Sequence, residues 1–488
     1  MPLFRGFTGG SNVERSSAID AELSVNCFRS TVETEGAAKP AYQLGTPGLR
    51  PLGTVDGARG RGVFTQDGRT WTVVGANVYE LTVDPWAATL RGTIPDDGSP
   101  VSFASNGDGG QQLAIVGGGQ LKILDLITHV LTAAIVLPLT KAPRHIGFLD
   151  GYFVLSEVDS LITYFSAIED GTTWDALDFF TRSTASDRVV AMTCANNRCW
   201  LFGSETSEAY EDVGDADNPF QPIKGSLFQI GIAGPWTLSV GVSTMRWLGQ
   251  SSKSGPVVYR LDGYNGTRIS THAIEAHLGT ATTLADAEGL TYEQDGHLFY
   301  ALSCPSLGAA GDTPVYDEIE HQWHFRRHYD ATRGEEQIWR VRGHAAVGQV
   351  HVVGSRDSGS IWALDLATYD DDGAILRLRR RAPYLGAENS VAFVDAFELG
   401  VEPGVGLNDG QGVDPQIELR VSKDLGKTWF SAGTAPLGAL GRYDDRTYWT
   451  RLGRARIDRL VFEVVITDPV KRVIGPGAWI RATPGRAA

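Results

Sequence analysis

The feature that most constrains this chain is a repeated unit of about 40 residues that begins near residue 60. Each unit opens with alternating apolar residues, passes through a turn rich in Gly, Asp and Asn, and returns as another short apolar run. One such unit cannot bury both of its faces, so units of this length pack radially around a common axis. The spacing predicts an all-β chain with a six- or seven-bladed β-propeller. Seven units are visible, at residues 61–90, 101–138, 145–182, 189–225, 237–271, 290–327 and 338–366.

The two ends of the chain lack this period. Residues 1–58 carry few strand patterns and many Gly, Pro and Ser residues, which predicts an extended N-terminal arm that packs on other parts. Residues 374–488 carry longer alternating runs, such as VAFVDAFELGV and RLVFEVVITD, which predict an antiparallel, sandwich-like β domain. The propeller is therefore expected at 59–373. Helix signals are weak, and residues 282–287 hold at most a turn or two.

Composition narrows the class of protein. The 58 glycines and 22 prolines fit frequent tight turns, and a charged fraction of 21% is ordinary for a globular chain. The net charge of −15 argues against a dedicated DNA-binding domain, although an acidic surface would repel DNA and let it slide. We expect a chain made soluble in the cytoplasm without membrane insertion, because no signal peptide opens it and its most apolar stretch, Val130–Leu139, is too short to span a bilayer.

Two of the four cysteines bracket a predicted hairpin turn. Cys194 and Cys199 flank Ala195-Asn196-Asn197-Arg198, and a two-residue turn at the asparagines would place the cysteines opposite each other. A disulfide is geometrically allowed, but a reducing cytosol favours two free thiols. No CxxC pair is present, which argues against a zinc site.

The clearest local motif is Ser422-Lys423-Asp424-Leu425-Gly426-Lys427-Thr428-Trp429, which fits the Asp-box pattern of sialidase-like propellers. Its mechanics are structural: Asp424 can accept bonds from turn amides, Gly426 allows a positive φ, and Trp429 packs beneath the hairpin. Partial echoes lie at 67–71 and 170–174. A glycoside hydrolase is the functional interpretation, and a hairpin turn is the favoured one.

Other clusters favour structural interpretations. Asp370, Asp371 and Asp372 could bind a metal, but adjacent side chains point different ways, so a solvated turn is expected. His321, His324 and His328 could form a ligand set. In a strand, however, Trp323 and Phe325 face the core together with His321 while His324 faces away, so the three histidines do not converge. P-loop, nucleophile-elbow and HExxH motifs are absent from the sequence. We therefore predict no catalytic residues, no metal and no cofactor.

Several segments resemble the tail hub proteins of short-tailed bacteriophages (podoviruses), also called tail nozzle or packaged-DNA stabilisation proteins. The segments follow the family's order along nearly the whole chain, and we find no matching motif between about 240 and 330. The N-terminal arm is similar through Asn26, Glu35, Lys39 and 46–49. The other matching segments are 150–153, 164–166, 202–210, 231–234, 446–456, 462–464 and 468–470.

The resemblance implies a non-enzymatic ring of the virion tail, usually a hexamer, below the portal and adaptor rings. It further implies a central channel that retains and conducts DNA, a plug or needle that closes this channel, and tailspikes or fibres on the flank. The alternatives are a propeller hydrolase, sialidase-like or a depolymerase, and a receptor-binding spike.

The ring leads to candidate assembly contacts. Repulsion among acidic copies calls for basic residues between subunits or toward the ring above. We predict such contacts at Arg377, Arg379, Arg380, Arg381, Arg451, Arg454 and Arg456. For the run 377–381, a charged strand edge that blocks aggregation stays an open alternative.

Overall fold

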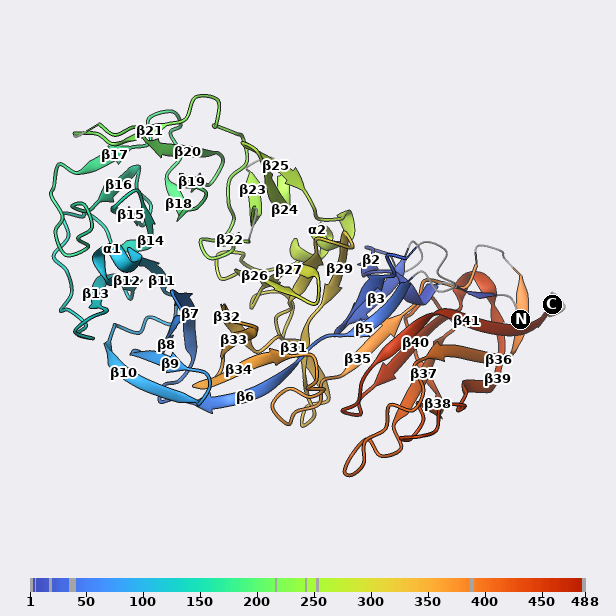
Figure 1. The fold of residues 1–488 in the computed structure, drawn as a ribbon. Coiled ribbons are helices and arrows are strands. Elements are labelled where there is room, and N and C mark those ends of the chain that lie inside the picture. Colours follow the sequence, from blue (N-terminus) through green and yellow to red (C-terminus); the bar gives the residue numbers. More distant parts are fainter. Residues whose placement is uncertain are drawn as a thin grey trace.

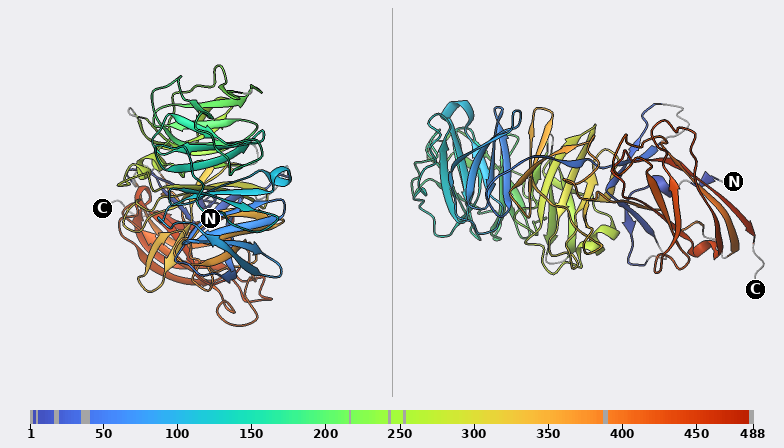
Figure 2. Two further views of the ribbon diagram at one scale, coloured as in Figure 1. Left: turned by 90° about the vertical axis from the view of Figure 1, so that its left-hand side faces the viewer. Right: turned by 90° about the horizontal axis from the view of Figure 1, so that it is seen from below.

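The computed structural model describes residues 3–4, 6–16, 20–34, 41–215, 217–241, 244–251, 254–386 and 390–484. Glu35 and Lys39, which belong to the family resemblance, lie outside these residues. The chain forms a propeller joined side by side to a β-sandwich, with both termini at the far end of the sandwich (Figures 1 and 2).

Seven antiparallel sheets surround the propeller axis, so the predicted propeller is confirmed, with seven blades (Figure 1). Blade 1 is β7 (Gly60–Gln66), β8 (Arg69–Val74), β9 (Asn77–Thr82) and β10 (Ala87–Thr93), and blade 2 is β11 (Ser102–Ser105), β12 (Gln112–Gly117) and β13 (Gln120–Asp125). Blade 3 is β14 (Pro143–Leu149), β15 (Tyr152–Glu157), β16 (Ile162–Phe165) and β17 (Phe179–Thr181), and blade 4 is β18 (Val189–Cys194), β19 (Cys199–Gly203), β20 (Ser207–Asp212) and β21 (Phe220–Pro222).

Of the remaining three blades, blade 7 is completed by a strand from outside the repeat. Blade 5 is β22 (Ser239–Val240), β23 (Met245–Ser251), β24 (Ser254–Asp262) and β25 (Asn265–Arg268), and blade 6 is β26 (Glu288–Gln294), β27 (His297–Ser303), β28 (Pro314–Asp317) and β29 (Gln322–Phe325). Blade 7 is β32 (Val341–Val347), β33 (Val350–Ser355) and β34 (Ser360–Asp365), completed by β6 (Gly48–Thr54). The propeller is thus closed by an N-terminal strand that pairs with β34.

Each pair of neighbouring blades shares one apolar cluster. Trp71 of blade 1 packs with Ile115 of blade 2, and further clusters follow around the axis until Tyr79 of blade 1 meets Ile361 of blade 7. Both faces of a blade are therefore buried, which is what makes a radial arrangement stable.

Two sheets form the sandwich around an eighth cluster, which contains Phe397, Trp449 and Phe462. One sheet has the order β39 (Thr447–Arg456), β36 (Val391–Val401), β41 (Val473–Pro484), β5 (Ala41–Gly45) and β4 (Cys27–Thr31), with β1 (Leu3–Phe4) on β41. The other contains β3 (Ala21–Val25), β35 (Leu378–Arg381), β40 (Val461–Ile466), β37 (Gln416–Ser422) and β38 (Phe430–Pro436), with β2 (Asn12–Val13) on β3.

The arm ties the two parts together. β3 lies between β29 of blade 6 and β35 of the sandwich, so blade 6 and one sandwich sheet form a continuous ten-stranded sheet. The division at 1–58, 59–373 and 374–488 stays a prediction.

Short elements complete the chain: η1 (Gly6–Thr8), α1 (Gly107–Gly110), α2 (His272–Leu278), η2 (Ile457–Arg459) and the hairpin β30 (Arg327–Asp330) to β31 (Glu335–Ile338). Residues 282–287, expected to hold at most a turn or two, contain one turn, closed by the Ala287 amide on the Leu284 carbonyl at 3.2 Å. The helix is α2, where Thr271 accepts a bond from the Ile274 amide at 3.4 Å.

Candidate functional site

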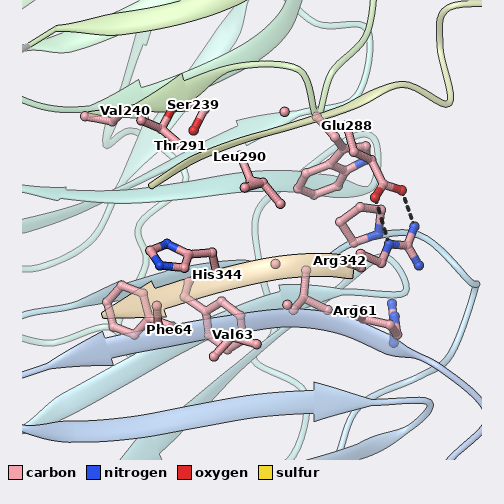
Figure 3. Close-up of a pocket in the computed structure, with 18 of the residues that line it drawn as sticks. Arg61, Val63, Phe64, Ser239, Val240, Glu288, Leu290, Thr291, Arg342 and His344 are labelled. Carbon is pink, nitrogen blue, oxygen red and sulfur yellow. Dashed lines mark hydrogen bonds and ion pairs between the residues drawn. The ribbon is translucent and has the colours of Figure 1, made fainter. Parts of the chain in front are cut away.

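Two cavities lie among the described residues near the propeller axis. The first, of about 410 Å³, is lined by inner strands of blades 1, 2, 5, 6 and 7 (Figure 3). The second, of about 460 Å³, opens beside blades 3 and 4. Pro100 and Trp236 line both cavities, and Trp236 is fixed by the His145 ring at 4.7 Å and by the Gly289 amide, which donates to its carbonyl at 2.8 Å. Trp236 therefore borders both cavities.

Charged side chains at the first cavity are held in ion pairs. Glu288 accepts from Arg342 at 3.0 Å (Figure 3). It also accepts from Arg356 at 2.9 Å, and Arg61 donates to Asp97 at 2.7 Å. Burial lowers the pKa of Arg61. Among the described lining residues Glu288 is the one carboxylate of this cavity, whereas a glycosidase needs two across a cleft. Nothing in the sequence pattern had singled out these residues.

The predicted arginine run begins at Arg377, directly before β35, and continues along β35 inside the ten-stranded sheet. Strand alternation sends Arg379 and Arg381 to one face and Arg380 to the other. The Arg380 side chain is 0% exposed and donates to the carbonyls of Gly6, Phe7 and Gly10, to Ser24 and to Glu22. Arg380 therefore holds the N-terminal arm in place and presents no charge at the surface of the single chain.

The other face of β35 forms an ion-pair network between propeller and sandwich. Arg379 donates to Glu336 of β31 at 2.7 Å and to Glu463 of β40 at 3.1 Å. Arg381 donates to Glu463 at 3.0 Å, and Arg377 lies 3.7 Å from Glu336. These three side chains are 11–15% exposed, so most of their charge is directed inward. We call this set the β35 network.

The carboxylates of the β35 network are held in their charged form. Burial alone would raise the pKa of Glu336, but Arg379 and Arg327 keep it below its ordinary value. Arg379 and Arg381 lower the pKa of Glu463 against the same effect of burial. The pKa of buried Asp312 is about 2, because Arg327 and His277 outweigh burial. Arg327 donates to both Asp312 and Glu336, which extends the network into blade 6.

The second predicted group lies on β39, an edge strand whose alternate residues face outward. Arg451 and Arg454 are exposed, and Arg456 pairs with Asp458 at 2.8 Å. The structure therefore separates the seven predicted arginines: four lie in or behind the β35 network and three lie on the outer sandwich sheet. A role in assembly stays a prediction for all of them.

The Asp box has the predicted geometry. Asp424 Oδ1 accepts from the amides of Lys427 and Thr428, at 3.0 and 2.8 Å, and the Trp429 indole donates to the Gly426 carbonyl at 3.0 Å. Gly426 has a φ of 85°. Bonds from Thr428 lower the pKa of Asp424 to about 2. Because both carboxylate oxygens accept bonds within the loop, this Asp stabilises a turn.

The echo at 170–174 forms a similar loop. Asp170 accepts from the amide and the hydroxyl of Thr172 and from Thr173, and Trp174 donates to the Gly171 carbonyl at 2.8 Å. The echo at 67–71 differs, because Asp67 and Gly68 form a plain two-residue hairpin turn.

Two sequence expectations need correction. Asp371 does not lie in a solvated turn; it is 0% exposed and lies beside β6, in a parallel β-bridge with Leu49. His324 faces away from Trp323 and Phe325 as predicted, yet it is buried too, with its ring 5.6 Å from that of Phe299. His324 is buried because a blade has apolar neighbours on both of its faces. Asp371 is buried because the N-terminal arm covers what would otherwise be an exposed edge.

The Asn196-Asn197 hairpin is confirmed. Both residues have positive φ, Cys194 and Cys199 are paired in register, and all four cysteines are free thiols.

These observations define a class of protein: a seven-bladed propeller joined to a β-sandwich. Family models described as Bacteriophage P22 Gp10 match both parts, the beta-propeller over residues 7–369 and the beta-sandwich over 377–478. The chain belongs to this family of phage tail hub and DNA-stabilisation proteins. The propeller family model also covers residues 240–330, where the sequence analysis found no matching motif. Membership makes the chain a phage tail component, hence a virion protein that assembles with other tail parts.

Comparison with other proteins adds only fold similarity. No curated protein matches the chain. Similar solved structures include the Neurospora crassa Pan2 WD40 domain, at 10% identity and a TM-score of 0.43 over 65% of this chain and 96% of that one. The N-terminal domain of Nup159 is 9% identical, with a TM-score of 0.42 over 71% and 99%. The designed Ika8 protein is 11% identical, with a TM-score of 0.38 over 70% and 100%. Within the described residues, no helix has the length and apolar character needed to cross a membrane.

Proposed function

We propose that this chain is the structural hub, or nozzle, of a short-tailed phage, and that it acts without catalysis. In this proposal six copies close into a ring below the portal and adaptor rings. The ring retains packaged DNA, conducts it during ejection, and anchors tailspikes or fibres on its flank, while a needle or plug closes the channel. The observation that carries the proposal is family membership across both the propeller and the sandwich.

The axial cavities support a channel formed between copies. Cavities of about 300–1,000 Å³ are of the size that encloses small molecules, and both axial cavities fall in that range. Cavities of this size are too small to hold a DNA duplex. We therefore propose that the conduit is a lumen enclosed by several subunits.

Charge supports a lumen through which DNA slides. At −15 per copy, a ring accumulates negative charge, so we propose an acidic or neutral lumen that repels the duplex. The isolated protein should bind free duplex DNA weakly, without sequence preference, and release it as salt rises. Tight, sequence-specific binding at physiological salt would contradict a conduit.

A glycan hydrolase is the alternative. At the axis Glu288 is held by two arginines, and the Asp424 carboxylate serves its own hairpin. Turnover of a host polysaccharide that one Asp or Glu substitution abolishes would establish the hydrolase instead.

The deciding experiment removes the chain from the phage. Particles assembled without it should package DNA and then lose it, and they should regain DNA and infectivity when the purified protein is added. Particles that keep their DNA and infect cells without the chain would refute the proposal.

A further inference from the structure

The outer face of the sandwich sheet β39–β36–β41 is basic and aromatic, on a chain that is acidic overall. Residues 440–484 contain nine basic and five acidic side chains. Arg451, Arg454 and Arg481 are exposed, and Phe393 and Tyr448, 46% and 50% exposed, lie on the same face. The register places Phe393 beside Arg454, Glu398 beside Tyr448 and Ala396 beside Arg481, and Arg451 lies at the bulge between Thr450 and Gly453. We therefore group these exposed side chains as one patch.

The carboxylates of Glu398 and Asp395 on this face accept hydrogen bonds from side chains of the same sheet and its flanking loop. Glu398 accepts from Arg446 at 2.9 Å, and Asp395 accepts from the Thr483 hydroxyl at 2.7 Å. We call the patch of Arg451, Arg454, Arg481, Phe393 and Tyr448 the basic face.

Blades 3 and 4 carry the opposite charge at their outer edge. Residues 160–225 contain eleven acidic and four basic side chains, a large share of the net charge of −15. The pKa of Tyr152 is raised by burial first and then by the negative charges of Asp212, at the end of β20, and Asp178, which precedes β17, so acids of both blades act on this tyrosine. Exposed apolar side chains lie among them, with Leu177 80% exposed. The acidic rim is Asp175, Leu177, Asp178, Phe179, Glu211, Asp212, Val213, Asp215 and Asp217.

The basic face and the acidic rim lie at opposite ends of the molecule. In Figure 1 the strands β17, β20 and β21 are at the upper left and β36, β39 and β41 at the right, and Figure 2 shows the same separation. A chain with complementary patches at its two ends cannot satisfy them within itself. Two such patches on different faces form a heterologous contact, which closes into a ring when the rotation per copy allows.

We propose that the basic face of one copy docks on the acidic rim of blades 3 and 4 of the next copy, and that this contact builds the ring. The partner is a second copy of this chain. Apolar side chains form the centre of the contact, and arginines face carboxylates at its border, as in ordinary protein interfaces. This inference rests on the proposed hub function, and it specifies which surfaces meet.

The test uses charge reversal on the full chain, with mass measured by native mass spectrometry and light scattering. Arg451→Glu with Arg481→Glu reverses the basic face, and Glu211→Lys with Asp217→Lys reverses the acidic rim. Each variant places like charges opposite each other, so we expect monomers at concentrations at which the wild type is a ring, with unchanged melting temperature. Asp262→Lys with Asp357→Lys makes the same charge change as the acidic-rim variant, but at exposed sites of blades 5 and 7. This control should keep the ring.

Mixing supplies the sharper outcome. The reversed face of one variant is complementary to the reversed rim of the other, so an equimolar mixture should form alternating rings, and a chain with all four substitutions should assemble alone. Rings in either reversed variant, or a mixture that stays monomeric, would overturn the docking proposal while the ring itself stands. A wild type that does not self-associate at any concentration would instead overturn the hub proposal and this contact with it.

Discussion

The two groups of arginines, on β35 and on β39, look alike in sequence and differ in their surroundings. On β35 the side chains alternate between a fully enclosed contact with the arm and a network with Glu336 and Glu463. On β39 they alternate with inward apolar residues and point outward from an edge strand. The difference shows that neighbouring strands decide whether the arginines of a basic run are buried in ion pairs or exposed at the surface. On the central strand the arginines connect the two domains, whereas on the edge strand they lie at the surface of the sandwich.

The largest effect should come from Arg380. Arg380→Met removes donors to three carbonyls of the arm and leaves Glu22 without its partner, so we expect a loss of about 3–5 kcal/mol in the free energy of unfolding. Urea denaturation measures it. Arg456→Met is the matched control on β39 and should change the free energy of unfolding by less than about 0.5 kcal/mol. Equal losses of unfolding free energy in the two variants would contradict the difference proposed between the arginines of β35 and those of β39.

Acid should weaken the β35 network next. Asp312, Glu336 and Glu463 have folded-state pKa values below their ordinary ones, so their stabilisation is complete above the unfolded values of about 3.9–4.3 and is lost as pH falls through the folded values. We expect the melting temperature to fall between about pH 5 and pH 2. Glu463→Gln, with one titrating group fewer, should melt lower at pH 7 and lose less on acidification. An identical pH dependence in both proteins would show that Glu463 is not part of the effect.

The Asp-box loop should have a smaller effect. The Arg381 guanidinium lies 4.7 Å from the Trp429 ring centre, so the loop supports one end of the β35 network. Asp424→Ala removes the acceptor of two turn amides and should lower the melting temperature, whereas Asp424→Asn, which keeps one acceptor oxygen, should lower it less. An unchanged melting temperature in Asp424→Ala would mean that these bonds do not contribute to stability.

Truncating the exposed arginines should have the smallest effect on the single chain. Arg451→Ala with Arg454→Ala should leave the free energy of unfolding within about 0.5 kcal/mol of wild type, because neither side chain is buried. Thermal melts check this. A large loss would place these arginines with those of β35.

Local patterns predicted much of this architecture. The period of the units identifies the propeller, Asn196-Asn197 identifies a hairpin, and the Asp box identifies its loop, because each depends on residues close in sequence. The alternation of Trp323, His324 and Phe325 between the two faces of their strand was predicted for the same reason, because it depends only on neighbouring residues.

Long-range pairing could not be predicted in this way. Nothing within 48–54 specifies that it completes blade 7, more than 300 residues away, and nothing in β3 specifies its place between β29 and β35. The same holds for the arginines of β35, whose carboxylate partners lie 43 and 84 residues from Arg379. Burial of Asp371 and His324 follows from these pairings and not from their own neighbours in sequence.

The most direct test of the account is a cryo-EM reconstruction of the phage tail that resolves this chain. The account predicts a closed ring, with six copies, whose DNA-sized lumen lies between subunits and whose basic faces meet the acidic rims of neighbouring copies. A monomer or trimer in the assembled particle, or DNA threaded through the axis of a single propeller, would contradict it.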